Sequence, residues 1–481
     1  MSTPAASVAQ RKTLRVGIVA RVHSLDPRQA RDLVSTLAVQ QIFETAYAVP
    51  RGEGAAPPVL CAGPLAEEAA GARRSAAVRS GIFFSDGTPL TAALMAASLN
   101  KVESMREQAR IEAAGDRVIF TLLKPNPRFD LALTLNHAAI VLEKDGKQLG
   151  TGAFIPAPGS TLEAVRLVRN PHYRARPALD EIVLTIYPPN QDGRPEALIR
   201  AVEAGEVDFT TMLSRTDAAE VKGVRKAFQP SNSTAALYFN TERPELRSAE
   251  VRRALALAID RIAVTEVSYS NALAFAATSL LPPMMGTFRD GISLDVEKAK
   301  ALFAQAPPPR PTRLRMLTVW APRPYVPHPR PAAEVIAREL AALGIEVEIV
   351  TPRNSDEFFR ACERGDYDMV LGGWIADTPD PADFLESNLH SEHIQSPNAG
   401  RGVGHINLAR FRSAAMDTAL RRFREDPTPE NRAGVMQIVA REVPLLPLMY
   451  GPSVVVSAWR VRSVDVSPLG VPHFEHFDIE A

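Results

Sequence analysis

The sequence predicts an α/β protein that is built from more than one packed unit. Its 481 residues exceed what one hydrophobic core usually holds, so two or more units are expected. Strands alternate with helices between 314 and 374, a pattern typical of β-α-β units and a parallel sheet. No run of about 18 uncharged apolar residues occurs in the sequence, so a membrane-spanning helix is not predicted.

The first half of the chain mixes strands with helices. Runs of apolar and β-branched residues predict strands at 14–20, 80–84, 118–123, 164–168, 181–187, 207–211 and 234–240. Apolar residues at helical spacing predict helices at 32–47, 91–102, 195–204 and 248–259. Thr91 and Ser248 are the expected N-caps, because a hydroxyl oxygen can accept from the first helical turn.

The second half carries the clearest alternation. Strands are predicted at 314–319, 345–350, 367–374 and 445–457. Helices are predicted at 331–343, 355–363, 411–424 and 431–442, and Gly344 is the expected stop of the first of them. These elements predict a second lobe over 246–455.

The charge balance argues against two classes of partner. Lys and Arg total 55 and Asp and Glu total 55, so the formal net charge is zero. Such a chain offers no electrostatic reason to bind nucleic acid or an anionic membrane.

Short motifs occur in a fixed order along the chain. They are Leu25–Pro27 (LDP), Phe84–Ala92 (FSDGTPLTA), Gly150–Phe154, Arg169–Tyr173, Gly205–Asp208, Leu237–Thr241 (LYFNT), Val251–Arg261 and Gly365–Pro381. Over about residues 14–470 this ordered set resembles the peptide-binding family (family 5) of ABC-transporter solute-binding proteins. The resemblance implies a two-lobed periplasmic-binding-protein fold with an extra subdomain in the first lobe and a hinge between the lobes.

The resemblance also implies domain limits. The first lobe is expected at 14–245, with a satellite subdomain at about 48–149, and residues 456–481 complete it. The second lobe is expected at 246–455. Residues 50–80 depart from the family pattern because they lack the tryptophan of its usual segment there, and this concerns the satellite subdomain.

The implied function is binding without chemistry. The resemblance implies a monomer that binds an oligopeptide or similar amine-bearing solute between its lobes and delivers it to the membrane subunits of an ABC transporter, without a cofactor. No Gly-x-Ser-x-Gly elbow, phosphate loop or dinucleotide-binding glycine motif occurs, so an enzyme is not predicted. The alternative is an intracellular ligand-sensing module of the same fold, with no role in transport.

The family resemblance and the N-terminal sequence predict different cellular locations for the protein. The resemblance implies the periplasm or the cell surface. Met1–Gln10 is small and polar, and Arg15 interrupts the apolar run Leu14–Ala20, so the start does not read as an export signal. A cytoplasmic location is therefore the alternative.

Trp374 and Asp377 form the first candidate ligand site. They follow a predicted strand, and ligands of α/β sheets bind at the carboxyl ends of strands. An aromatic face beside a carboxylate suits a ligand with a cationic end and an apolar body. The resemblance implies that Asp377 holds the α-ammonium group of a peptide. The residues alone also allow a core tryptophan followed by a turn aspartate.

Asn240 and Asp32 are two further candidate ligand contacts. The amide of Asn240 can donate to and accept from a peptide backbone, and the alternative is an asparagine that shapes a turn. Asp32 follows the Leu25–Pro27 turn at a position that could face the ligand. Its alternative is an acidic group at a helix N-terminus.

The histidines and cysteines predict no metal centre. His390, His393 and His405 lack the spacing of zinc ligands and are expected on the surface, as are His473 and His476. Cys61 and Cys362 are expected to be two buried thiols, and their pairing is left open.

Overall fold

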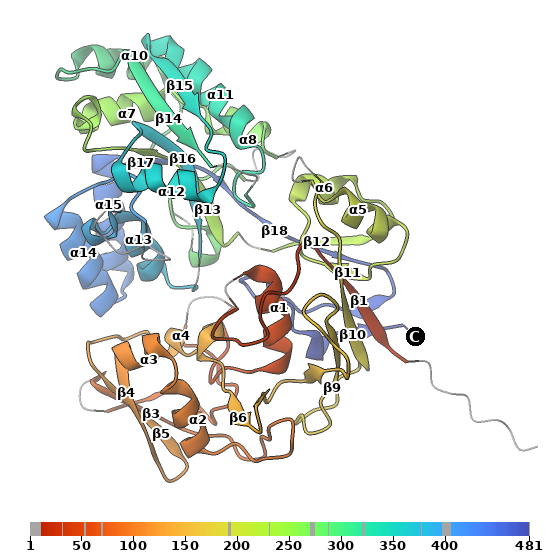
Figure 1. Cartoon of the computed structure of the whole chain (residues 1–481). Coiled ribbons are helices and arrows are strands. Elements are labelled where there is room, and N and C mark those ends of the chain that lie inside the picture. Colours follow the sequence, from red (N-terminus) through yellow and green to blue (C-terminus); the bar gives the residue numbers. More distant parts are fainter. Residues whose placement is uncertain are drawn as a thin grey trace, which may run out of the picture. The chain divides into compact units, whose positions relative to one another are not determined.

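The chain divides into two units, which we call unit 1 and unit 2 (Figure 1). The computed structural model describes residues 11–30, 32–51, 54–68, 71–190, 194–229, 231–269, 275–286, 288–319, 323–376, 378–396 and 406–480. Unit 1 consists of Met1–Leu213, Asp217–Phe228 and Val454–Ala481, and unit 2 consists of Ser214–Thr216 and Gln229–Ser453.

Unit 1 is built on a seven-stranded sheet. Its strand order is β12 (Arg225–Gln229), β18 (Ser453–Ser457), β11 (Phe209–Thr210), β1 (Thr13–Ile18), β10 (Glu181–Ile186), β9 (Arg166–Arg169) and β8 (Phe154–Pro156). Strand β1 runs parallel to β10 and β11, and its apolar side chains pack with those of α1 (Leu33–Ile42) in one core. Helices α5 (Glu196–Glu203) and α6 (Arg215–Glu220) precede and follow β11.

A four-stranded antiparallel sheet inside unit 1 has its own core. The strand order is β2 (Ala66–Glu68), β3 (Arg73–Ala77), β5 (Arg117–Leu122) and β4 (Ala109–Ala114). Its core gathers buried residues from 46–140, including Phe84 and Phe120. Thr91 caps α2 (Ala92–Leu99) as predicted, by accepting from the backbone of Leu94. Residues 80–84 form a single bridge from Phe83 to Pro89 rather than the predicted strand.

Short elements complete unit 1. They are α3 (Glu103–Gln108), α4 (Phe129–Ala132), β6 (Leu142–Lys144), β7 (Lys147–Leu149), β19 (Val461–Ser463) and β20 (Asp478–Ile479).

Unit 2 is built on a five-stranded mixed sheet. Its strand order is β15 (Glu346–Val350), β14 (Arg313–Thr318), β16 (Met369–Ile375), β13 (Ser233–Phe239) and β17 (Leu445–Tyr450). Helices α11 (Pro329–Leu340) and α12 (Ser355–Arg364) separate β14, β15 and β16, and β14 is parallel to both neighbours. The predicted β-α-β arrangement of 314–374 is therefore confirmed.

The start of unit 2 differs from the sequence prediction. The sequence predicts a second lobe from 246, whereas the main segment of unit 2 begins at Gln229. Strand β13 belongs to it because β13 pairs along its length with β16 and β17. The predicted strand 445–457 is two strands, since β17 ends at Tyr450 in one sheet and β18 starts at Ser453 in the other.

The helices of unit 2 contribute buried apolar side chains to the same core as its sheet. They are α7 (Ala249–Leu257), α8 (Arg261–Glu266), α10 (Val296–Gln305), α13 (Pro381–Leu389), α14 (Ala414–Glu425) and α15 (Pro429–Glu442). Ser248 caps α7 as predicted. Helices α13, α14 and α15 lie together as one group (Figure 1). None of the helices in the described ranges is long and apolar enough to cross a lipid bilayer.

The two cysteines are buried free thiols, as predicted. Burial raises the pKa of Cys61 to about 11 and also raises that of Cys362, so neither is a reactive thiolate at neutral pH.

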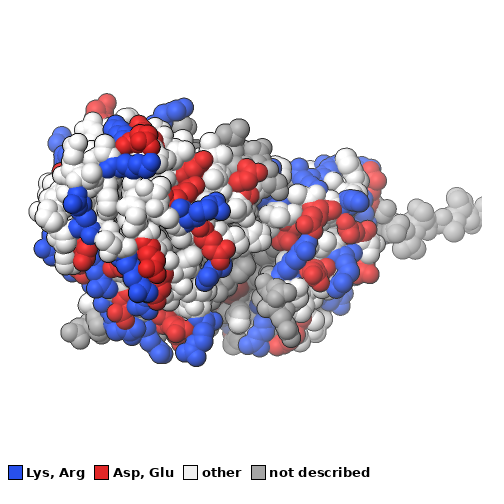
Figure 2. All heavy atoms as spheres, turned by 90° about the horizontal axis from the view of Figure 1, so that it is seen from above, with Lys and Arg blue, Asp and Glu red and all other residues white. Residues whose placement is uncertain are grey.

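On the face shown in Figure 2, acidic and basic side chains are interspersed.

Candidate functional site

Trp374 lies near the carboxyl end of β16, at the sheet edge that the sequence predicts. Strand β16 pairs with β13 in antiparallel fashion, and Trp374 lies directly opposite Thr234 of β13. Trp374 is half-buried against the core of unit 2, and the next residue, Ile375, is 41% exposed. An aromatic side chain that is only partly covered at this edge can still offer surface to a solute.

Asp377 lies outside the described residues. The turn that follows it is defined by Asp380, whose side chain accepts from the backbone nitrogen of Ala382 at 2.9 Å and so caps α13. Asp380 therefore has a structural role at the start of α13.

Gly373, directly before Trp374, lets the ring of Tyr325 lie close to the strand. A Cβ atom on Gly373 would come within 2.6 Å of the carbonyl oxygen of Thr234 and 2.7 Å of the ring of Tyr325. Tyr325 is buried, and burial raises its pKa to about 12, so it is a neutral phenol at neutral pH. Sequence reasoning missed Tyr325, and the Gly372-Gly373 pair ahead of a tryptophan was the signal for a close neighbour.

Hydroxyl groups are concentrated at the same edge of the sheet. Ser231 donates to the carbonyl oxygen of Gly451 at 3.0 Å, which ties the start of β13 to the end of β17. Thr318 and Thr351, at the ends of β14 and β15, are hydrogen-bonded at 3.1 Å. The hydroxyl of Thr234 is buried and has no hydrogen-bond partner among the described residues. Most polar groups at this edge are therefore hydrogen-bonded, and Trp374 is a half-buried aromatic group beside them.

Asn240 lies at the opposite edge of this sheet. Phe239 pairs with Met369 at one end of the β13–β16 ladder, and Trp374 lies at the other end. At about 3.3 Å per residue, this separates Asn240 from Trp374 by about 20 Å, so they cannot share one small ligand. The structure therefore does not bring these two predicted contacts together.

The side chain of Asn240 is occupied by backbone groups. Its amide nitrogen donates to the carbonyl oxygen of Tyr367 at 2.8 Å, and its oxygen accepts from the backbone nitrogen of Glu242 at 3.1 Å. The residue is buried. These are the contacts of the turn asparagine that the sequence left open as the alternative.

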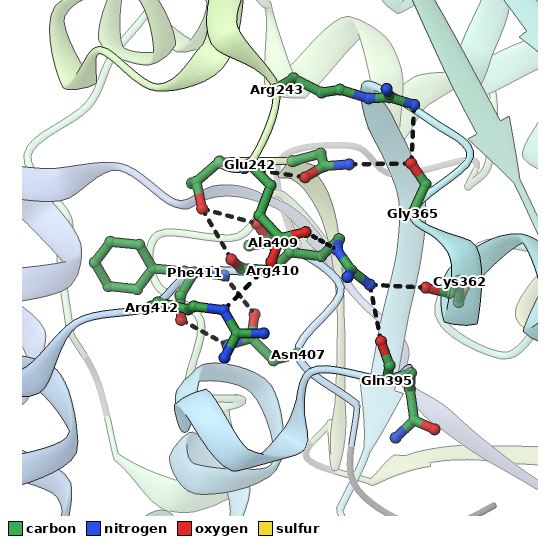
Figure 3. A network of polar contacts seen from close by, with 12 residues as sticks. Glu242, Arg243, Cys362, Gly365, Gln395, Asn407, Ala409, Arg410, Phe411 and Arg412 are labelled. Atoms are coloured by element: carbon green, nitrogen blue, oxygen red, sulfur yellow. Dashed lines mark hydrogen bonds and ion pairs between the residues drawn. The ribbon is translucent and has the colours of Figure 1, made fainter. Parts of the chain in front are cut away.

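Arg410 belongs to the same polar network, in which it contacts Glu242 (Figure 3). Its guanidinium donates to the carbonyl oxygens of Cys362 at 3.0 Å and Gln395 at 2.9 Å and pairs with Glu242. It also packs over Gly365, where a Cβ atom would lie 3.1 Å from it and where φ is +66°. The LYFNT motif and the start of the Gly365–Pro381 motif therefore meet in a structural network, which sequence reasoning did not foresee.

Asp32 has a defined role in unit 1. It is the N-cap of α1, and its carboxylate accepts from the backbone nitrogen of Ser35 at 2.8 Å. This is the helix-terminal role that was the alternative to ligand contact, and an N-cap carboxylate can still accept further hydrogen bonds.

The described histidines form no obvious metal centre. Within the described ranges no group of three or more His, Cys, Asp or Glu side chains is placed to hold a metal ion. His393 lies 2.7 Å from the carbonyl oxygen of Glu386, and His405 lies outside the described residues.

The sequence of residues 76–396 matches the model of the family described as bacterial extracellular solute-binding proteins, family 5. The chain belongs to solute-binding protein family 5. A heme-binding protein A of Haemophilus influenzae is 29% identical over 343 residues, which are 69% of this chain and 59% of that protein. A dipeptide-binding protein of Escherichia coli is 23% identical over 390 residues, 76% of this chain and 70% of that one. The chain thus matches less than two thirds of the length of the Haemophilus influenzae relative.

Solved structures of similar fold cover almost the whole chain. HbpA2 of Haemophilus parasuis superposes with a TM-score of 0.84 at 22% identity, over 98% of this chain and 100% of that one. A dipeptide-binding protein of Pseudoalteromonas in complex with Met-Leu superposes with a TM-score of 0.74 at 19% identity, over 98% and 100%. The predicted periplasmic-binding-protein fold of family 5 is therefore confirmed.

Proposed function

We propose that this family 5 protein captures an oligopeptide or a similar amine-bearing solute and delivers it to the membrane subunits of an ABC transporter. The observation that carries the proposal is the family match over residues 76–396. It is supported by relatives that are named as dipeptide-binding proteins, one of which is solved with Met-Leu. The alternative of an intracellular sensing module is not favoured, because the relatives are named for binding and transport.

In this proposal Trp374 and Asp377 receive the ligand. Trp374 covers the apolar part of the solute from the carboxyl edge of β16, where it is only half-buried. Asp377 holds the ammonium group, because a carboxylate and an ammonium form a strong charge-assisted hydrogen bond once water is displaced. Asp32 remains a predicted contact from unit 1. Asn240 does not contact the solute in this proposal, because its side-chain amide is hydrogen-bonded to backbone groups and holds a turn.

The proposal includes no chemical step. The solute is bound and released unchanged, by a monomer on the outer side of the cytoplasmic membrane, and no cofactor takes part. Water can remain around the side chains of the solute while its backbone is held by hydrogen bonds, which suits a protein that accepts several peptides.

Calorimetric titration with dipeptides tests this function. Met-Leu and other dipeptides with a free amino group should bind, and N-acetylated forms of the same dipeptides should bind at least tenfold more weakly. A protein that binds none of a panel of di-, tri- and tetrapeptides would contradict the peptide proposal.

A second candidate function is the binding of haem. The observation that favours it is the 29% identity to a protein named for haem, compared with 23% to the dipeptide-binding protein of Escherichia coli. Titration with ferric haem, followed by the absorbance of its Soret band, tests it. A difference spectrum that does not saturate would contradict specific haem binding.

A further inference from the structure

A pocket of about 650 Å³ lies within unit 1. It is bounded by the end of α1, by parts of 45–59 and 134–139, by Tyr173 and Arg174, and by the chain segment 465–476. This volume is in the range of sites for cofactor-sized ligands. Every residue of the pocket belongs to unit 1, whereas Trp374 belongs to unit 2.

Two histidines on the pocket wall each lie beside a carboxylate, and His476 is hydrogen-bonded to its partner. His476 Nδ1 lies 2.7 Å from Asp465 Oδ2, and His473 Nδ1 lies 3.4 Å from Glu475 Oε1. The two imidazole rings are 6.1 Å apart between centroids. No hydrogen bond or ion pair to the Nε2 atom of either ring is made by any described residue.

This arrangement prepares both rings to bind a metal. A carboxylate at Nδ1 keeps the proton on that nitrogen, which leaves the lone pair of Nε2 free and makes it more basic. Histidines that bind metals in proteins carry such a partner on their other nitrogen. The side chains of His473 and His476 are 33% and 62% exposed, so a ligand in the pocket can reach them.

The rest of the pocket suits a large ligand with both apolar and polar parts rather than a bare metal ion. Apolar side chains line it, among them Phe43, Val49, Val59, Leu469 and Val471. With only two imidazoles and no third ligand in place, a free ion would lack most of its coordination shell. A metal that arrives with four equatorial nitrogens needs only an axial ligand, and histidine is the usual one for haem iron.

Two arginines complete the lining. Arg174 forms two hydrogen bonds with Glu44, at 2.7 and 2.8 Å, and lies over the ring of Tyr173 at 4.6 Å. Arg51 pairs with Asp465, and its side chain is 59% exposed. Guanidinium groups with remaining N–H donors can bind the acidic edge of a porphyrin.

We propose that this pocket of unit 1 binds haem, with the imidazoles of His473 and His476 as the source of the axial iron ligand. The proposal rests on the second candidate function above and gives it a site. Iron exchanges one or both axial water or hydroxide ligands, which leave to solvent, for bonds to Nε2 atoms, and it keeps its oxidation state.

Titration with ferric haem of the parent and of the double variant His473→Gln/His476→Gln tests the site. Glutamine keeps a donor for the two carboxylates and removes the imidazole. The parent should give a Soret band typical of imidazole-ligated haem, and the double variant should bind at least tenfold more weakly without that band. The matched control is His390→Gln/His393→Gln, a second histidine pair with rings 5.5 Å apart, in unit 2, which should behave like the parent.

Two further measurements separate the possible failures. Metal-free protoporphyrin should bind the parent and the double variant alike, because only the iron bond is lost. Electron paramagnetic resonance of the parent complex reports nitrogen ligation without any substitution, so it remains decisive where the variant is unstable. Haem that binds the double variant with the parent's affinity and spectrum overturns the site and leaves the haem function standing. A parent that binds no haem overturns both.

Discussion

Arg460 donates from Nε to the carboxylate of Asp208 at 2.7 Å, across 252 positions of sequence. Arg15 of β1 binds the same carboxylate from Nη2 at 2.7 Å and from its backbone nitrogen at 2.9 Å. The side chain of Asp208 is fully buried. This aspartate of the Gly205–Asp208 motif therefore joins the first strand of unit 1 to its returning C-terminal segment.

Asp208→Asn should destabilise the protein by roughly 2–4 kcal/mol, because it leaves two arginines beside an uncharged, buried amide. Burial alone would raise the pKa of Asp208, but the bonds from Arg460 and Arg15 lower it below its ordinary value. A carboxyl group with a lowered pKa stabilises the fold above its unfolded pKa, and this stabilisation is lost as pH falls. Urea unfolding should therefore show the largest difference at neutral pH and a smaller one in acid. The control is Glu206→Gln, at an exposed residue nearby in sequence. If the parent and Asp208→Asn have the same free energy of unfolding, the ion pairs of Asp208 with Arg15 and Arg460 do not stabilise unit 1.

The close packing around Gly373, the residue before Trp374, predicts that a larger side chain there will destabilise the protein. Gly373→Ala places a methyl group within 2.6 Å of a backbone oxygen, so the strand or Tyr325 must shift, at a cost of about 1–3 kcal/mol. The matched control is Gly434→Ala inside α15, where no atom lies within 4 Å and alanine favours the helix by about 1 kcal/mol. Thermal unfolding should thus move in opposite directions for the two variants. A Gly373→Ala protein as stable as the parent would show that the edge at Trp374 is loosely packed.

Glu339 makes the stability of unit 2 depend on pH. Burial raises its pKa from 4.5 to about 7, although its carboxylate accepts from the backbone nitrogen of Asp260 at 3.0 Å. The folded protein keeps this proton after the unfolded chain has lost it, so stability falls as pH rises from about 4.5 to 7. Glu339→Gln removes the effect and keeps an acceptor for Asp260. Because the residue is half-buried and screened, the gain at pH 8 should be on the order of 1 kcal/mol, with no gain at pH 4.

Denaturant unfolding at both pH values measures this difference. Glu334→Gln, on the exposed face of the same helix, is the control and should change stability by the same small amount at both. A gain from Glu339→Gln that is equal at pH 4 and pH 8 would be a packing effect and not a titration.

The parts of the fold that the sequence predicted are those set by local chemistry. The hydroxyls of Thr91 and Ser248 cap their helices because a cap depends on a few adjacent residues. Long-range pairing was not predicted: β13 joins unit 2 through strands more than 100 residues later in the chain, so its boundary was misplaced. The same ladder separates Asn240 from Trp374. Strand position and side-chain chemistry singled out both residues, but only the strand pairing shows that they lie at opposite edges.

The pocket of unit 1 shows a different limit of sequence reasoning. His473 and His476 have no metal-ligand spacing, and the sequence predicts surface histidines. Asp465 and Glu475 lie close to them in sequence, but nothing in the pattern shows that the end of α1 faces them across a pocket. Such a site depends on chain segments more than 400 residues apart.

The sharpest test of the proposed function is Asp377→Asn. If Asp377 holds the ammonium group of a peptide in a site without water, removing its charge leaves that cation unpaired. Truncating one member of such a pair costs roughly 2–5 kcal/mol, which corresponds to a loss of affinity of about 30-fold to several thousand-fold. Asparagine keeps the shape of the side chain, so the substitution tests charge rather than packing.

The choice of peptide and of control variant isolates this charge. The loss should appear for a dipeptide with a free amino group and shrink for its N-acetylated form, which has no charge there. Asp380→Asn is the matched control: Asp380 caps α13, so its substitution should lower thermal stability and leave affinity within a few-fold of the parent. If Asp377→Asn binds a free-amine dipeptide as tightly as the parent, Asp377 is not the amine anchor. The Trp374–Asp377 segment would then be a packed tryptophan followed by a turn, and the ligand's charge would have to be met elsewhere in the protein.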